Sequence, residues 1–118
     1  MKRVIFAAWL VPQLTHADPA ALAAYVASFD AGDPAACVAT FAPEATFIDL
    51  GNDFSDRIDW FCNAVVDGDG TYTILSQETE GDTTTFTVDY RAGGYFLQSQ
   101  GTLRGTDGKI AALTIERR

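Results

Sequence analysis

The sequence is poor in positive charge, and this shortage excludes two kinds of partner. Of its 118 residues, eight are Lys or Arg and sixteen are Asp or Glu, which gives a net charge of −8. Four of the eight positive residues (Lys2, Arg3, Arg117 and Arg118) lie at the two ends, so the chain between them is strongly acidic. An acidic surface repels phosphate backbones and anionic lipid headgroups. We therefore expect binding neither to nucleic acid nor to membranes.

The residues that metal and nucleophilic chemistry need are also scarce. The chain has one histidine, His16, and two cysteines, Cys37 and Cys62, which are too few for a zinc site or a Ser-His-Asp triad. There is no glycine-rich phosphate loop. The acidic residues between 53 and 59 follow a helix face and are expected to be solvated. The sequence thus predicts neither a metal site nor a cofactor.

No apolar run reaches the ~18–20 residues of a membrane-spanning helix. The longest apolar stretch, Val4–Val11, follows Lys2 and Arg3 and resembles a short signal peptide. We expect residues 1–17 to form a folded extension that covers apolar surface in a cytoplasmic protein. The alternative is an export signal that is cleaved near Ala17.

Cys37 and Cys62 are expected to be small buried residues. A disulfide between the two helices that carry them is the alternative, and it would accompany export.

Residues 18–118 are expected to form one domain, because this length supports one hydrophobic core but not two. Asp18-Pro19 is typical of a helix start, and apolar residues follow at helical spacing until Gly32. Asp33-Pro34 repeats the signal and predicts a shorter helix that includes Phe41 and stops at Pro43.

The rest of the chain alternates between one more helix and several strands. Residues 45–50 are β-branched and aromatic and predict a short strand, whereas residues 53–66 predict a third helix. Beyond Gly70, apolar and polar residues alternate between three turns, which predicts a four-stranded antiparallel meander. The expected fold class is α+β, with three N-terminal helices packed in a curved, mainly antiparallel sheet that forms a cone-shaped α+β barrel.

This order of elements resembles the nuclear transport factor 2-like (NTF2-like) superfamily. Within it, the segments 25–33 (YVASFDAGD) and 41–49 (FAPEATFID) are similar to ketosteroid isomerase and to SnoaL-like polyketide cyclases, without a gap between Tyr25 and Asp49. The resemblance covers about residues 18–116. It implies that Asp49 is a general base and that Tyr25 is a phenol that hydrogen-bonds to a developing oxyanion. The superfamily's second oxyanion donor falls on Gly101, and its supporting tyrosine falls on Phe61.

The resemblance also implies a cavity lined mainly by apolar side chains. The expected ligand-binding residues are Trp60, Phe61, Phe86, Val88, Tyr90, Leu97, Ser99, Gly101, Leu103 and Leu113. The expected function is cofactor-free acid–base chemistry on a small apolar carbonyl compound, of isomerase, cyclase or dehydratase type. The alternative is a non-catalytic small-ligand-binding or assembly domain of the same fold.

The superfamily commonly pairs through the outer face of its sheet, so a homodimer is expected here. That face would carry Thr85, Thr87, Phe96, Gln98, Gln100 and Thr102.

Overall fold

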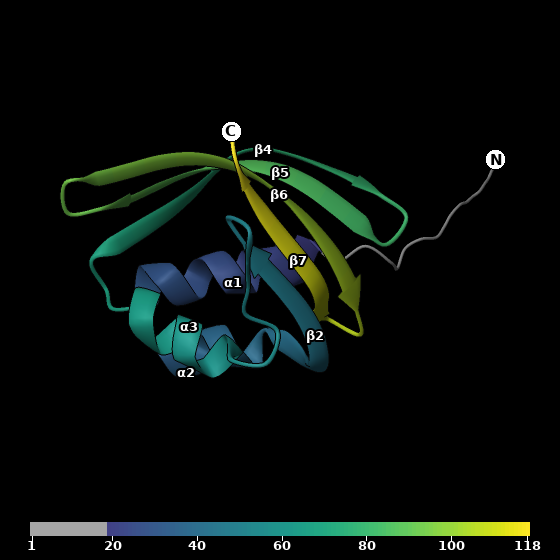
Figure 1. Cartoon of the computed structure of the whole chain (residues 1–118). Helices are drawn as coiled ribbons and strands as arrows, with labels where there is room; N and C mark the ends of the chain where they lie inside the picture. Colours follow the sequence, from purple (N-terminus) through teal and green to yellow (C-terminus); the bar gives the residue numbers. More distant parts are fainter. Residues whose placement is uncertain (1–18) are drawn as a thin grey trace, which may run out of the picture.

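One curved sheet curls around three helices in the computed structural model, which describes residues 19–118 (Figure 1). The sheet is curled but not closed, and all three helices lie on its concave side (Figure 1). The predicted α+β class is confirmed. The expectations for residues 1–17, including those for His16 and a cleavage site, lie outside the described residues.

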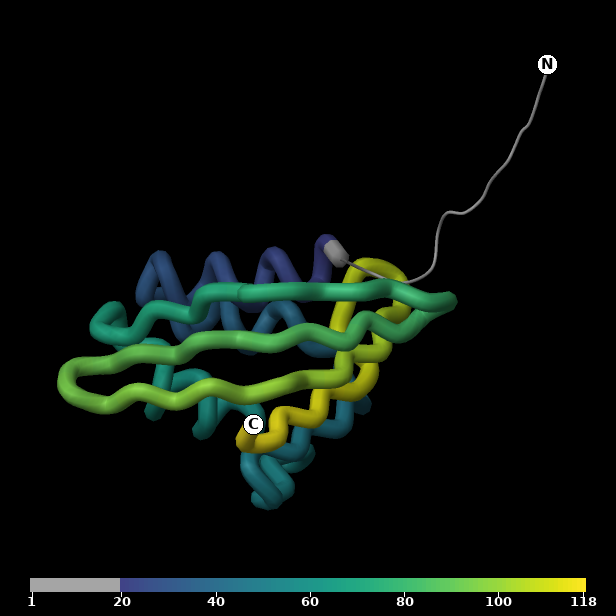
Figure 2. The backbone as a smooth tube through the Cα atoms, turned by 90° about the horizontal axis from the view of Figure 1, so that it is seen from above, coloured from purple at the N-terminus to yellow at the C-terminus, as the bar shows by residue number. Residues whose placement is uncertain are grey.

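Three helices form, and the first two begin at the prolines of their predicted start signals. They are α1 (Pro19–Ala31), α2 (Pro34–Ala39) and α3 (Ile58–Val65). The side chain of Asp33 caps α2 by accepting a hydrogen bond from the Ala36 amide at 3.1 Å. α1 packs against α2 and runs beside β4 (Gly70–Glu80), so its buried stripe faces the sheet (Figure 2).

The sheet combines a meander with two earlier strands. The meander strands are β4, β5 (Thr83–Ala92), β6 (Tyr95–Thr106) and β7 (Lys109–Arg117). The earlier strands are β2 (Phe41–Asp49) and β3 (Asn52–Asp53), and the spatial order is β3-β2-β7-β6-β5-β4. All neighbours are antiparallel except β2 and β7. This parallel pair places Asp49, the last residue of β2, beside Ile115 of β7.

Two predicted boundaries are wrong. Phe41 belongs to β2 and not to the second helix, because it pairs with Ile110 of β7, and this tertiary pairing outweighs its helical spacing from Cys37. The third helix begins at Ile58 and not at residue 53. Asp53 instead forms part of β3, and its carboxylate accepts a hydrogen bond from the Ser55 amide.

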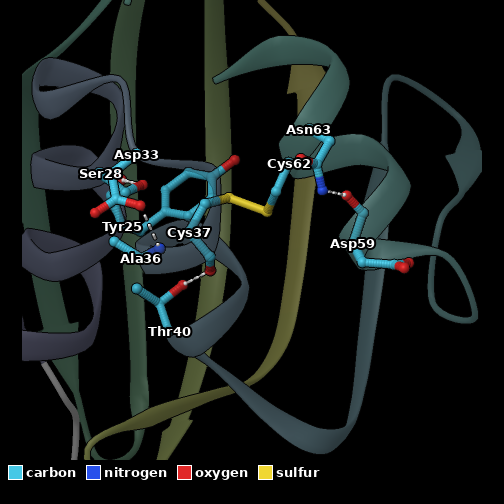
Figure 3. Close-up of a disulfide and its surroundings, with 9 residues drawn as sticks. All are labelled: Tyr25, Ser28, Asp33, Ala36, Cys37, Thr40, Asp59, Cys62 and Asn63. Carbon is cyan, nitrogen blue, oxygen red and sulfur yellow. Dashed lines mark hydrogen bonds between the residues drawn. A yellow bond between two sulfur atoms is a disulfide. The ribbon is translucent and has the colours of Figure 1, made fainter. Parts of the chain in front are cut away.

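A disulfide joins α2 to α3 through Cys37 and Cys62, whose side chains are fully buried (Figure 3). The two cysteines are therefore buried as expected, but they are paired, as in the alternative interpretation. The bond fixes the two short helices against each other beneath the sheet. Tyr25 of α1 belongs to the same hydrophobic core as these two cysteines (Figure 3).

Candidate functional site

Tyr25 lies in the buried stripe of α1, one turn before Phe29. Only 1% of its surface is exposed, and its ring makes edge-to-face contacts with those of Phe29, Phe41 and Tyr72 at centroid distances of 5.1, 5.9 and 5.4 Å. Burial raises the pKa of the Tyr25 phenol well above its usual value, and nearby Tyr72 and Asp49 act in the same direction. The hydroxyl therefore stays protonated at neutral pH and is able to donate a hydrogen bond.

Asp49 is the last residue of β2 and is held at a tight turn. Its register partners are Asn52 of β3 and Ile115 of β7, and the amide of Leu50 donates a hydrogen bond to the Ile115 carbonyl at 2.9 Å. The side chain is only partly exposed, and burial raises its pKa from 3.8 to about 6. A carboxyl group with this pKa can both accept and release a proton near neutral pH.

Tyr25 and Asp49 line one pocket of about 190 Å³. Among residues 19–118, Asp49 is the only charged residue in its wall. The lining residues come from α1, α3, the β2–β3 turn and the meander, and they are Tyr25, Phe29, Asp49, Leu50, Phe61, Val65, Tyr72, Val88, Tyr90, Tyr95, Leu97, Ser99 and Ile115. A lone carboxyl group thus faces apolar side chains and tyrosine hydroxyls.

Half of the expected ligand-binding residues line this pocket, namely Phe61, Val88, Tyr90, Leu97 and Ser99. Those on β5 and β6 follow the alternation of the strands, which turns every second side chain inward. Gly70 leaves space for the Tyr90 ring, because a Cβ atom on Gly70 would lie 2.8 Å from the Tyr90 hydroxyl.

The other half lie elsewhere. Trp60 is 56% exposed and stacks on Phe54 outside the pocket, at a centroid distance of 6.0 Å. Leu103 and Leu113 are buried in the core away from the pocket wall. Gly101 pairs with Phe86, whose ring lies so close that a Cβ atom on Gly101 would come within 2.3 Å of it. Phe86 therefore covers the position that the resemblance assigns to a second oxyanion donor.

Tyr72 of β4 is a polar pocket residue that the sequence analysis missed. It is 8% exposed, and its hydroxyl is buried without a hydrogen-bond partner among residues 19–118. The alternation of Tyr72 and Ile74 with threonines predicted an inward side chain, but nothing in that pattern separates a pocket residue from a core residue. Phe29, Leu50, Val65, Tyr95 and Ile115 also line the pocket and were not predicted to do so.

The described residues contain no group of three or more His, Cys, Asp or Glu side chains that could hold a metal ion. Within the same part of the chain, no helix has the length and apolarity needed to cross a bilayer. Among residues 19–118, the polar side chains that line the pocket supply one carboxyl group, four phenols and one serine hydroxyl.

No protein-family model and no curated protein matches the sequence. Solved structures do match. An NTF2-like protein of unknown function from Cytophaga hutchinsonii superposes with a TM-score of 0.72 at 13% identity, covering 89% of this chain and 95% of that one. A candidate polyketide cyclase from Sinorhizobium meliloti also gives 0.72, at 23% identity over 83% of this chain and 94% of that one.

A third match has a ketosteroid isomerase-like fold and comes from Catenulispora acidiphila. Its TM-score is 0.66 at 19% identity, over 83% of this chain and 85% of that one. At these identities the similarity establishes the fold.

Proposed function

We propose, from the NTF2-like fold of residues 19–118, that this protein is a cofactor-free acid–base enzyme acting on a small apolar carbonyl compound. The observation that carries the proposal is one small pocket shared by Asp49 and Tyr25. The carboxyl group has a pKa of about 6, and burial keeps the phenol protonated. These are the states that a general base and an oxyanion donor need at neutral pH.

In the proposed reaction, the Asp49 carboxylate takes a proton from the carbon next to the carbonyl group. The C–H bond breaks, an O–H bond forms on Asp49, and the electron pair moves to the carbonyl oxygen as an enolate. The Tyr25 hydroxyl hydrogen-bonds to that oxygen while its charge develops. Asp49 then returns the proton to another carbon in an isomerisation, or to a leaving hydroxyl group in a dehydration.

The pocket restricts the substrate by size and by charge. Its volume of about 190 Å³ lies below the ~300–1,000 Å³ of typical ligand sites. Asp49 disfavours an anion, and the remaining lining side chains are neutral. The proposed substrates are therefore small neutral enones, β-diketones or β-hydroxy ketones.

The test compares Asp49→Asn with Tyr25→Phe on whichever enone or β-diketone the wild type converts. Asn cannot accept the proton, so turnover should fall by ~10²–10⁴-fold, the usual contribution of a general base. Tyr25→Phe should slow turnover by up to ~10²–10³-fold. Wild-type rates in Asp49→Asn would contradict the proposal.

Phe86 over Gly101 favours a second candidate, a domain that binds a small molecule without converting it. Native mass spectrometry of the purified protein distinguishes the two. A co-purified ligand that survives unchanged, together with no turnover across the carbonyl panel, would support the binding domain.

We also infer that the protein works in an oxidising compartment. Disulfides between buried cysteines are typical of exported proteins and rare in the cytosol. The Cys37–Cys62 bond thus supports the export alternative over cytoplasmic location. Alkylation of the protein from its source cells, denatured without reductant, should leave both cysteines unmodified; two alkylated thiols would contradict the inference.

A further inference from the structure

The Tyr72 hydroxyl is buried at the pocket without a partner, and this is costly. A buried polar group that makes no hydrogen bond typically destabilises the fold by ~1–3 kcal/mol. Tyr72 nevertheless lines the pocket, is more than nine-tenths buried, and has no hydrogen-bond partner for its hydroxyl among the described residues. A ligand atom in the pocket is the partner that would satisfy it.

The position of Tyr72 beside Tyr25 indicates what kind of ligand atom its hydroxyl would bind. The two rings meet edge to face with centroids 5.4 Å apart, and both side chains line the pocket that contains Asp49. Burial raises the pKa of the Tyr72 phenol above its usual value, although the neighbouring Tyr25 hydroxyl acts in the opposite direction, so Tyr72 also stays protonated and is able to donate. Two adjacent phenol donors suit an oxygen that becomes negatively charged.

We propose that Tyr72 is a second oxyanion donor, which binds the substrate's enolate oxygen together with Tyr25. Tyr72 thereby supplies from β4 the donor that Gly101 of β6 cannot supply. This inference rests on the proposed function, and it makes Tyr72 a catalytic residue in contact with substrate. Both phenols keep their protons during the step, and the proton taken from carbon resides on Asp49.

A nitrophenolate serves as the probe, because it is a planar oxyanion like an enolate and its colour reports its ionisation. Binding should be measured in Asp49→Asn, since a neutral side chain there imitates the protonated Asp49 of the intermediate and removes charge repulsion. On that background, Tyr72→Phe and Tyr25→Phe should each weaken nitrophenolate binding by ~10- to 100-fold, as expected for a hydrogen bond to a charged acceptor.

Thr84→Val provides the matched control. Thr84 is fully buried on β5, and its hydroxyl hydrogen-bonds to that of Thr79 at 3.0 Å. It lies four residues along the strand from Val88, the nearest pocket residue of β5, or about 13 Å. This variant should lose stability and keep its affinity for nitrophenolate. Tyr72→Phe should do the opposite, keeping or gaining thermal stability, because it removes a hydroxyl without a partner.

Unchanged nitrophenolate binding in Tyr72→Phe, with weakened binding in Tyr25→Phe, would overturn this inference and leave the proposed function standing. A stability loss in Tyr72→Phe as large as that in Thr84→Val would also overturn it, because the hydroxyl would then be structural. Failure of Asp49→Asn to bind nitrophenolate would overturn the oxyanion site itself, and with it both proposals.

Discussion

At the scale of single residues, the burial that raises the pKa of Asp49 also lowers the stability of the folded protein at neutral pH. Its pKa in the folded protein, about 6, is higher than 3.8, so the folded state binds a proton more tightly than the unfolded state does. Between these two values the free energy of unfolding falls as pH rises, and the loss persists at higher pH. Asp49 therefore destabilises the protein at pH 8 relative to pH 4.

Asp49→Asn should accordingly raise the free energy of unfolding at pH 8 and change it little at pH 4. The full shift corresponds to ~3 kcal/mol, and partial solvent contact reduces the expected gain to about 1–2 kcal/mol. Urea denaturation of both proteins at the two pH values measures this gain.

Asp53→Asn is the control for this measurement. Asp53 is exposed, and hydrogen bonds from Ser55 lower the pKa of its carboxyl group. The ionised Asp53 carboxylate therefore stabilises the folded protein above pH 4, and this stabilisation is lost in acid. Asp53→Asn should lower the free energy of unfolding at pH 8. The same sign of change in both variants would contradict the burial of Asp49.

At the scale of elements, the β2–β3 turn holds Asp49 in place with an unusual residue. Leu50 and Gly51 connect the paired residues Asp49 and Asn52, and both have positive φ, 51° and 86°. A type I′ hairpin turn requires positive φ at both of its central residues, and leucine is uncommon at these positions. The Leu50 side chain lines the pocket, so the strained backbone places an apolar group next to the carboxyl group.

Leu50→Ile tests this strain because it conserves volume and adds a branch at Cβ, which positive φ disfavours. We expect it to be about 1 kcal/mol less stable than Leu50→Met in urea denaturation. Equal stabilities would indicate that the turn relaxes without cost.

The disulfide between α2 and α3 is the second feature that fixes the arrangement of the elements. It closes a loop with a sequence separation of 25 residues, for which chain entropy gives about 3.5 kcal/mol of stabilisation. The double variant Cys37→Ala/Cys62→Ala should lose at least that much in urea denaturation compared with the oxidised wild type. If the reduced and oxidised wild type unfold at the same urea concentration, the disulfide does not stabilise the fold and this prediction is wrong.

The elements differ in how far the sequence predicted them. Turn glycines and strand alternation located the meander, because both are local properties of the chain. Phe41 was misplaced because it pairs with Ile110 of β7, which is about 70 residues away in the sequence and leaves no local signal. In the site, Asp49 and Tyr25 were identified through a resemblance. Tyr72 could not be, since an inward tyrosine looks the same in sequence whether or not its hydroxyl has a partner.

At the scale of the whole molecule, the outer face of the meander is exposed to solvent in the part of the chain that the structure describes. Phe96 is 50% exposed there, beneath the guanidinium of Arg91 at 4.4 Å from the ring centroid, and Gln98 and Gln100 are exposed beside it. We propose that two copies of the chain pair through this face, as expected from the sequence. The contact would cover Phe96 in both copies.

Phe96→Glu should therefore weaken the dimer by more than ~10-fold in sedimentation velocity, because each copy would bring a negative charge into the contact. Trp60→Glu is the control, since Trp60 is equally exposed but lies on α3, away from the sheet face. A wild type that stays monomeric at all concentrations, or equal effects of the two variants, would contradict this pairing.

The proposal that Asp49 is the base is tested most directly by solvent deuterium exchange. The rate at which the protein exchanges the α-protons of a small enone in D2O is followed by NMR as a function of pH. We predict that the wild-type rate rises with pH to a plateau, with a midpoint near the Asp49 pKa of about 6. Asp49→Asn should be slower by ~10²–10⁴-fold and lack this midpoint. Equal rates and equal pH profiles in the two proteins would contradict the account.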